Sequence, residues 1–190
     1  MTNFVLLHGA FHGGWCWPRV AGPLRAAGHA VITPTQTGLG ERALPQRVRQ
    51  LIYLDSVMLQ DGQSPLDRSA PGVADERRRL AGATGGLSVA PPDPTVFGVP
   101  PGPDCEWMRR RLTPHPFGTL DSPLRLTHLL GNGLPCTYVA CMDPEYVTLA
   151  GHRAFARAQP GWDYREIPTG HNPMITAPDL LVALLEELTA

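Results

Sequence analysis

The chain has 190 residues, of which 43% are hydrophobic, and a formal net charge of −1. This length predicts one domain with a sizeable core, and a charge near zero gives no electrostatic basis for binding nucleic acid or an anionic membrane. Neither a run long enough to span a bilayer nor an N-terminal signal region is recognisable, so we expect a cytoplasmic protein.

The chain begins with a predicted strand, a glycine-rich turn and a helix. Residues 4–7 (FVLL) are a short apolar run typical of a buried strand, and residues 8–14 (HGAFHGG) form the turn. Residues 18–27 follow as a helix, with Pro18 in its first turn and Gly28 at its end. A turn of this kind can leave backbone N–H groups pointing at a ligand oxygen, which is the geometry of an oxyanion hole.

Later segments alternate between strand and helix. Strands are predicted at residues 30–33, 47–54, 135–142 and 163–167, and helices at residues 144–158 and 177–188. This alternation indicates a mostly parallel α/β sheet, in which ligands collect at the carboxyl ends of the strands. Residues 8–14, Asp55, Asp143 and His171 all follow predicted strands, so we expect them at that edge.

A different composition marks the middle of the chain. The sequence contains 21 prolines and 20 glycines, and residues 59–130 hold most of the prolines together with two Arg-rich helical pieces, 75–81 and 106–112. Such a segment predicts an irregular cap. It would be inserted into a core formed by residues 1–58 and 131–190.

Taken in order, these motifs resemble the α/β-hydrolase superfamily, and in particular its branch of small bacterial esterases, plant methyl esterases and hydroxynitrile lyases. HGAFHGGWCW is similar to the oxyanion region of that branch. TGLGER, LIYLDSVMLQDGQS, TYVAC and GHNPMITAPDLLVALL follow in the family's order. The resemblance implies a parallel sheet flanked by helices, no cofactor or metal, a Ser–His–acid triad, and a small, largely apolar ester or carbonyl ligand.

One part of the family pattern is missing. The serine should lie in a G-x-S-x-G elbow between a strand and a helix, but the chain contains no such motif. Only residues 43–48 separate TGLGER from LIYLD, where a helix, a strand, a second helix and their loops would need roughly 45–50 residues. The resemblance therefore predicts a core shortened by loss of the nucleophile strand and its helices, with the join near Ala43 and Leu44.

The remaining triad members can be placed by the same resemblance. His171 matches the catalytic histidine, and imidazole is the natural general base near neutral pH. Three carboxylates stay open as the acid: Asp143 and Glu145 after the fourth strand, and Asp55 after the third. A loop or helix-capping role is the alternative for each of them.

Further site residues follow from the match to the oxyanion region. Ala10 and Phe11 correspond to the residues whose backbone N–H groups face the oxyanion. The second donor normally comes from the residue after the nucleophile, so it is missing with the elbow. The resemblance also places the ligand beside four other residues: His8, Gly9, His12 and Met174.

Other nucleophiles are weakly supported by the sequence. Ser56 follows a strand but lacks the glycines of a sharp elbow, and Cys16 and Cys141 are expected to be packed. The four cysteines show no C-x-x-C spacing, which favours small buried thiols over disulfides or a zinc site.

Three functions remain open from the sequence. The first is a shortened carboxylesterase-like protein with little or no esterase activity. The second is a non-catalytic protein that binds small molecules, and the third is a serine-independent lyase or cyclase with His171 as general base. The expected strand order is AVIT, FVLLH, LIYL, TYVAC, DYREI, with the second and third strands paired directly or separated by a gap. Uncovered apolar sheet surface would favour a homodimer.

Overall fold

The structure is a computed structural model that describes residues 1–35 and 48–190. Its strands are β1 (Asn3–Val5), β2 (Ala30–Ile32), β3 (Leu51–Leu54), β4 (Ser88–Val89), β5 (His115–Pro116), β6 (Cys136–Cys141) and β7 (Asp163–Ile167). Its α-helices are α1 (Pro18–Ala26), α2 (Val73–Gly82), α3 (Pro103–Arg109), α4 (Gly118–Asp121), α5 (Ala150–Arg157), α6 (Pro173–Thr176) and α7 (Pro178–Thr189). Short 3₁₀ turns are η1 (Gly14–Cys16), η3 (Pro94–Phe97) and η4 (Val147–Leu149). Among the described residues, no helix is long and apolar enough to cross a membrane.

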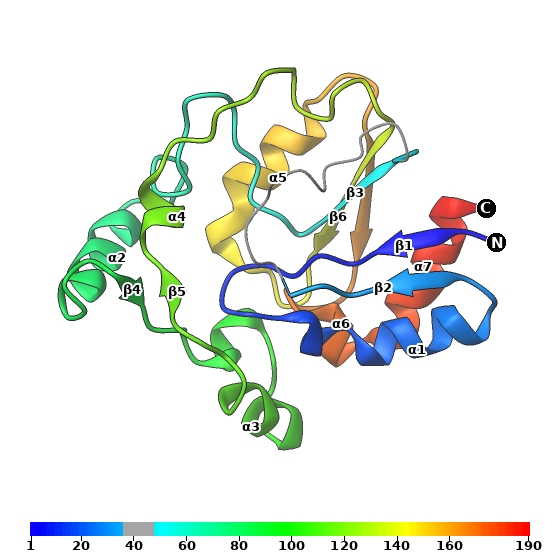
Figure 1. The fold of residues 1–190 in the computed structure, drawn as a ribbon, viewed down its shortest axis with the longest axis horizontal. Helices are drawn as coiled ribbons and strands as arrows, with labels where there is room; N and C mark the ends of the chain where they lie inside the picture. Colours follow the sequence, from blue (N-terminus) through cyan, green and yellow to red (C-terminus); the bar gives the residue numbers. More distant parts are fainter. Residues whose placement is uncertain (36–47) are drawn as a thin grey trace.

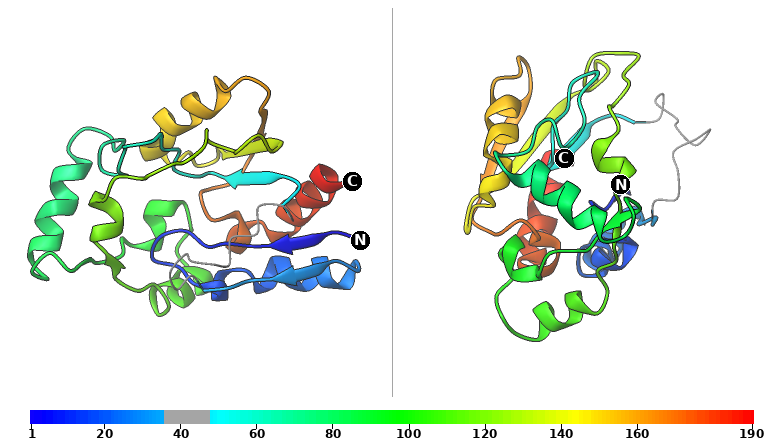
Figure 2. Two further views of the ribbon diagram at one scale, coloured as in Figure 1. Left: turned by 45° about the horizontal axis from the view of Figure 1, so that its top comes forward. Right: turned by 90° about the vertical axis from the view of Figure 1, so that its left-hand side faces the viewer.

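The core strands are parallel and fall into two groups. One contains β2 and β1, and the other contains β3, β6 and β7 in that order. Figure 1 and the left view of Figure 2 place β3 beside β1, on the side away from β2. Within the described residues no hydrogen-bonded pairing joins β1 to β3. The predicted strand order is therefore confirmed, with a gap between its second and third members.

Helices cover the sheet unevenly. Helices α1, α6 and α7 enclose the main core, where Phe4 and Leu6 meet Leu24 and Leu181. All six residues of β6 are buried, because α5 packs on one of its faces and α7 on the other. By contrast, β1 and β2 are covered on one face only: Phe4 and Val31 point into the core, whereas Val5 and Ile32 point outward.

Local chemistry explains the position of two turns. Gly28 follows α1 with a φ of +87°, the left-handed conformation that ends many helices and that glycine adopts most easily. Gly14 lies at the start of η1, where a Cβ atom would come within 2.2 Å of the Thr33 carbonyl oxygen. Only glycine therefore fits in this turn beside β2.

Two segments differ from the sequence-based expectation. The helix predicted for residues 144–158 begins later in the structure, as η4 followed by α5. The residues before it form a tight turn, in which Met142 and Glu145 make an isolated β-bridge. In the segment between β3 and β6, α2 and α3 overlap the two Arg-rich pieces that were predicted to be helical. The short helix α4 and the small antiparallel pair of β4 with β5 were not predicted (Figure 1). The loop 35–42 and the join near Ala43 and Leu44 lie wholly or mainly outside the described residues.

We expect the uncovered face of β1 and β2 to cause self-association. Val5 pairs with Ile32 across the two strands, and Val5, Ile32 and Leu7 are 58%, 61% and 51% exposed. Contiguous apolar patches of more than a few hundred Å² usually mark association sites. Light scattering should show dimers or larger species at rising concentration. The double variant Val5→Thr/Ile32→Thr, which keeps β-branched side chains, should shift the distribution toward monomer, whereas Val147→Thr, an exposed valine elsewhere, should not. A parent chain that stays monomeric throughout the titration would contradict this expectation.

Candidate active site

The centre of the candidate site is a hydrogen bond between Asp55 and His171. Asp55 directly follows β3 with a φ of +41°, a left-handed conformation that Asp tolerates better than most residues. Nδ1 of His171 lies 2.8 Å from Oδ2 of Asp55. An ionised carboxylate can only accept, so Nδ1 carries the hydrogen and the neutral ring keeps its lone pair on Nε2. In the described part of the chain, no hydrogen bond occupies Nε2, which is the atom that a general base uses.

Arg153 holds Asp55 from the opposite side. Its Nε and Nη2 atoms lie 2.8 Å and 3.1 Å from the two carboxylate oxygens, and the side chains of Arg153 and Asp55 are almost fully buried. Burial by itself would raise the pKa of Asp55, but the hydrogen bonds from His171 and Arg153 outweigh it and hold the pKa below its usual value. Asp55 is therefore ionised at neutral pH.

The same guanidinium fixes the chain after β6. Arg153 donates to the Cys141 carbonyl at 3.1 Å, to the Tyr146 carbonyl at 3.3 Å and to Oε1 of Glu145 at 2.8 Å. One buried cation thus joins the end of β3, the turn after β6 and α5. This arrangement positions the ring of Tyr146, whose centroid lies 5.0 Å from that of His171.

The glycine-rich turn brings the candidate oxyanion donors to this edge. Phe11 has a φ of +67°, and its ring packs against Phe97 and Leu112. No hydrogen bond within the described residues uses the backbone N–H of Ala10 or Phe11. Both N–H groups are therefore without a hydrogen-bond partner in the described chain, as a donor in an oxyanion hole must be before a ligand binds.

His12 lies next to the same turn. Its Nδ1 donates to the Ala10 carbonyl at 2.7 Å, and its ring stacks on Trp15. Burial lowers the pKa of His12 despite that hydrogen bond, and the nearby imidazoles of His171 and His8 lower it further. Its buried Nε2 has no partner among the described residues. His12 is thus a neutral imidazole close to His171.

Known proteins resemble this chain in sequence and in fold. The carbendazim-hydrolysing esterase of Nocardioides sp. (strain SG-4G) is 28% identical over 251 residues, covering 99% of this chain and 100% of that protein. Methyl jasmonate esterase 1 of Vitis vinifera is 40% identical over 90 residues, covering 46% of this chain and 32% of that protein. No protein-family model matches.

Solved structures extend the comparison. An extracellular α/β-hydrolase from a Paenibacillus species has a TM-score of 0.83 at 18% identity, covering 98% of each chain. A pyrethroid hydrolase from Sphingobium faniae JZ-2 has a TM-score of 0.72 at 20% identity, covering 98% of this chain and 96% of that one. The chain has the α/β-hydrolase fold. Its curated sequence relatives are esterases.

Within this α/β-hydrolase fold, His171 is paired with Asp55 and not with Asp143. Asp143 is exposed, and its backbone N–H donates to the Thr169 carbonyl. Glu145 is occupied by Arg153. The pairing follows from the sheet: β3 lies directly beside β6, and the N–H of Asp55 donates to the Val139 carbonyl at 2.7 Å. Of the three carboxylates that the sequence left open, Asp55 is the one that reaches the histidine.

Sequence reasoning missed Arg153, although a signal for it exists. Helix α5 buries His152, Arg153 and Ala156, and an arginine on the buried face of a helix requires a buried anion nearby. Of the carboxylates that follow predicted strands, Asp55 meets this requirement. Looking for the partner of Arg153 would therefore have favoured Asp55 as the acid.

The residues expected to bind the ligand are only partly brought together. His8 and Gly9 remain at the glycine-rich turn, where Nδ1 of His8 contacts the Gly9 carbonyl. Met174 is buried in the main core with Phe4 and Ile175. It therefore supports the fold from within α6.

None of the hydroxyl or thiol groups weighed as a nucleophile reaches His171. The chain has five serines, all within the described residues, and no hydrogen bond there joins a serine to His171. Ser56 instead donates to the Val57 carbonyl. The cysteines are free and buried. Burial raises the pKa of Cys16 to about 12 and that of Cys141 far above its usual range, so neither forms a thiolate at neutral pH.

Proposed function

We propose that this α/β-hydrolase keeps the acid–base pair of an esterase but lacks its serine nucleophile. On this proposal the protein binds small, largely apolar esters or carbonyl compounds and has little or no serine-type esterase activity. The observation that carries it is the free Nε2 of His171, which has no hydroxyl or thiol partner in the described chain. Residues 36–47, which lie outside that description, contain neither serine nor cysteine.

The gap in the sheet supports the same proposal. The nucleophile strand of the family lies between the strands that correspond to β1 and β3, and these two do not pair in the described chain. The alignment with the Nocardioides esterase spans 251 residues against the 190 of this chain, a difference of 61. A strand with two helices and their loops accounts for most of that difference, at roughly 45–50 residues.

A second candidate is chemistry that needs no serine. His171, whose Nδ1 is held by ionised Asp55, can accept a proton from a bound ligand through Nε2. Ala10 and Phe11 could then stabilise the resulting oxyanion through their backbone N–H groups. This arrangement is the basis for a lyase or cyclase reaction as the second candidate function.

Covalent labelling tests the proposed loss of the nucleophile. A fluorophosphonate probe reacts only with a serine that is activated by a base within hydrogen-bond reach. We expect no labelling of this chain by mass spectrometry, with the Nocardioides esterase as the positive control. A labelled peptide containing Ser56 would overturn the proposal.

A further inference from the structure

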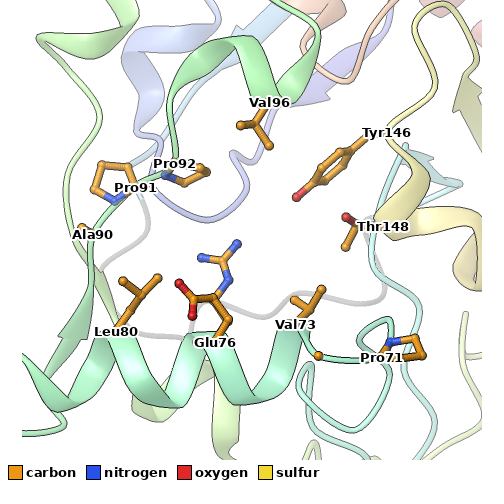
Figure 3. A pocket seen from close by; sticks show the side chains of 12 residues that line it. Pro71, Val73, Glu76, Leu80, Ala90, Pro91, Pro92, Val96, Tyr146 and Thr148 are labelled. Carbon is orange, nitrogen blue, oxygen red and sulfur yellow. The ribbon is translucent and has the colours of Figure 1, made fainter.

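A pocket lies under the cap, beside the candidate site. Its volume is about 450 Å³, within the range of small-molecule sites. Figure 3 shows its walls, which come from α2, the segment after β4, η3 and the loop after β6. Most of the lining is apolar: Val73, Leu80, Ala90, Pro91, Pro92 and Val96.

Among the described residues, two charged side chains line this pocket, Glu76 and Arg77, and Glu76 is already paired with a cation. Both oxygens of Glu76 accept from Arg79 at 2.7 Å, which holds the carboxylate against its own helix. Arg77 has no carboxylate partner among the described residues and lies over the ring of Phe11, with 5.4 Å from its Cζ atom to the ring centroid. The pocket therefore presents one uncompensated cation beside an apolar wall.

That combination fits an amphiphilic anion. A guanidinium matches the planar geometry of a carboxylate and can bind it through two parallel hydrogen bonds. The proline, valine and leucine side chains would bury a hydrocarbon or aromatic body and favour it by the hydrophobic effect. We propose that this pocket binds small apolar monocarboxylates, with the carboxylate on Arg77.

The pocket adjoins the candidate site at two points. The ring of Tyr146 lines it and also contacts the ring of His171 at 5.0 Å between centroids. Phe11, under Arg77, carries one of the candidate oxyanion N–H groups. A ligand held between Arg77 and Tyr146 therefore lies next to the Asp55–His171 pair. This inference rests on the proposed function, because it takes the pocket to be the ligand site of a hydrolase-fold protein that does not convert its ligand.

Binding of octanoate, compared with its neutral analogue octanamide, tests this proposal. Titration calorimetry of the full chain should show that octanoate binds about ten- to a hundredfold more tightly than octanamide. A hydrogen bond to a charged group typically contributes this much to affinity. Arg77→Met should abolish this preference, and Arg77→Lys should keep part of it. Arg78→Met is the matched control, because Arg78 lies on the same helix but pairs with Asp75 and Asp121 and does not line the pocket.

Three outcomes would overturn the inference: equal affinity for octanoate and octanamide, an unchanged preference in Arg77→Met, or an equal loss in Arg78→Met. An equal loss in Arg78→Met would indicate that octanoate is attracted by the general positive charge of this surface and not by Arg77. Circular dichroism of each variant confirms that it is folded before titration. Fluorophosphonate labelling with intact octanoate preference would reject the proposed function alone, whereas no labelling and no preference would reject this inference alone.

Discussion

A p-nitrophenyl ester should be hydrolysed by this chain about 10⁶-fold more slowly than by a serine hydrolase with an intact triad. Acyl transfer through a covalent intermediate needs a hydroxyl within hydrogen-bond reach of the base. Nε2 of His171 has no such partner in the described chain. Enzymes that lose the nucleophile alone keep roughly 10³–10⁴-fold over water through binding and the oxyanion hole. On the proposal that the second oxyanion donor is lost with the elbow, we expect a smaller residual rate than that.

The variant His171→Ala distinguishes an absent nucleophile from a hidden one. If no serine is activated, this change should leave the residual rate of ester hydrolysis unaltered. A parent chain that hydrolyses the ester rapidly, and loses that activity in both His171→Ala and Ser56→Ala, would show that Ser56 acts as the nucleophile. Initial rates at several substrate concentrations, corrected for buffer hydrolysis, provide the measurement.

The order of the strands could be predicted because the motifs kept their sequence order and their chemistry. The run LIYL predicts β3, TYVAC predicts β6, and DYREI predicts β7, and parallel pairing places their carboxyl ends at one edge. The absence of G-x-S-x-G predicted where the sheet would be interrupted. The gap between β1 and β3 is at that position.

The pairing of Asp55 with His171 could not be chosen from local sequence. Asp55 and Asp143 both follow strands, and both are polar residues in turns. What separates them is the direction of the side chain, set by the left-handed backbone of Asp55, and the cation that neutralises it from α5. Such contacts join residues 98 and 116 positions apart, so no short motif reports them.

The cap was predicted least well. Its prolines and glycines indicated irregular chain, but β4 and β5 pair over only two residues each, too short to show alternation. The pocket depends on α2 facing the segment after β4, and on Tyr146 reaching it from the other side. Periodicity within any single segment gives no information about that arrangement.

Arg153→Met should reduce the free energy of unfolding by about 3–5 kcal/mol, because removing one partner leaves a buried charge uncompensated. The free energy of unfolding of a typical domain is only about 5–15 kcal/mol, so this loss is a large share of it. Arg157→Met is the matched control on the same helix. Its guanidinium is exposed and pairs with Glu166, so we expect a much smaller loss of stability than in Arg153→Met. Urea unfolding followed by circular dichroism gives both values.

The pH dependence of stability in the same two variants tests whether Arg153 acts through the charge of Asp55. The pKa of Asp55 is lowered in the folded state, so its ionisation stabilises the fold above the unfolded pKa of about 3.9, and this stability is lost as the pH falls through the lower folded pKa. Removing Arg153 takes away one of the two hydrogen-bonding partners that lower this pKa. The deficit in stability of Arg153→Met relative to the parent chain should therefore be largest above the unfolded pKa of about 3.9 and should narrow as the pH falls and Asp55 is protonated, whereas the deficit of Arg157→Met should show no such narrowing. A parallel loss of stability at every pH would mean that Arg153 acts through packing, not through the charge of Asp55.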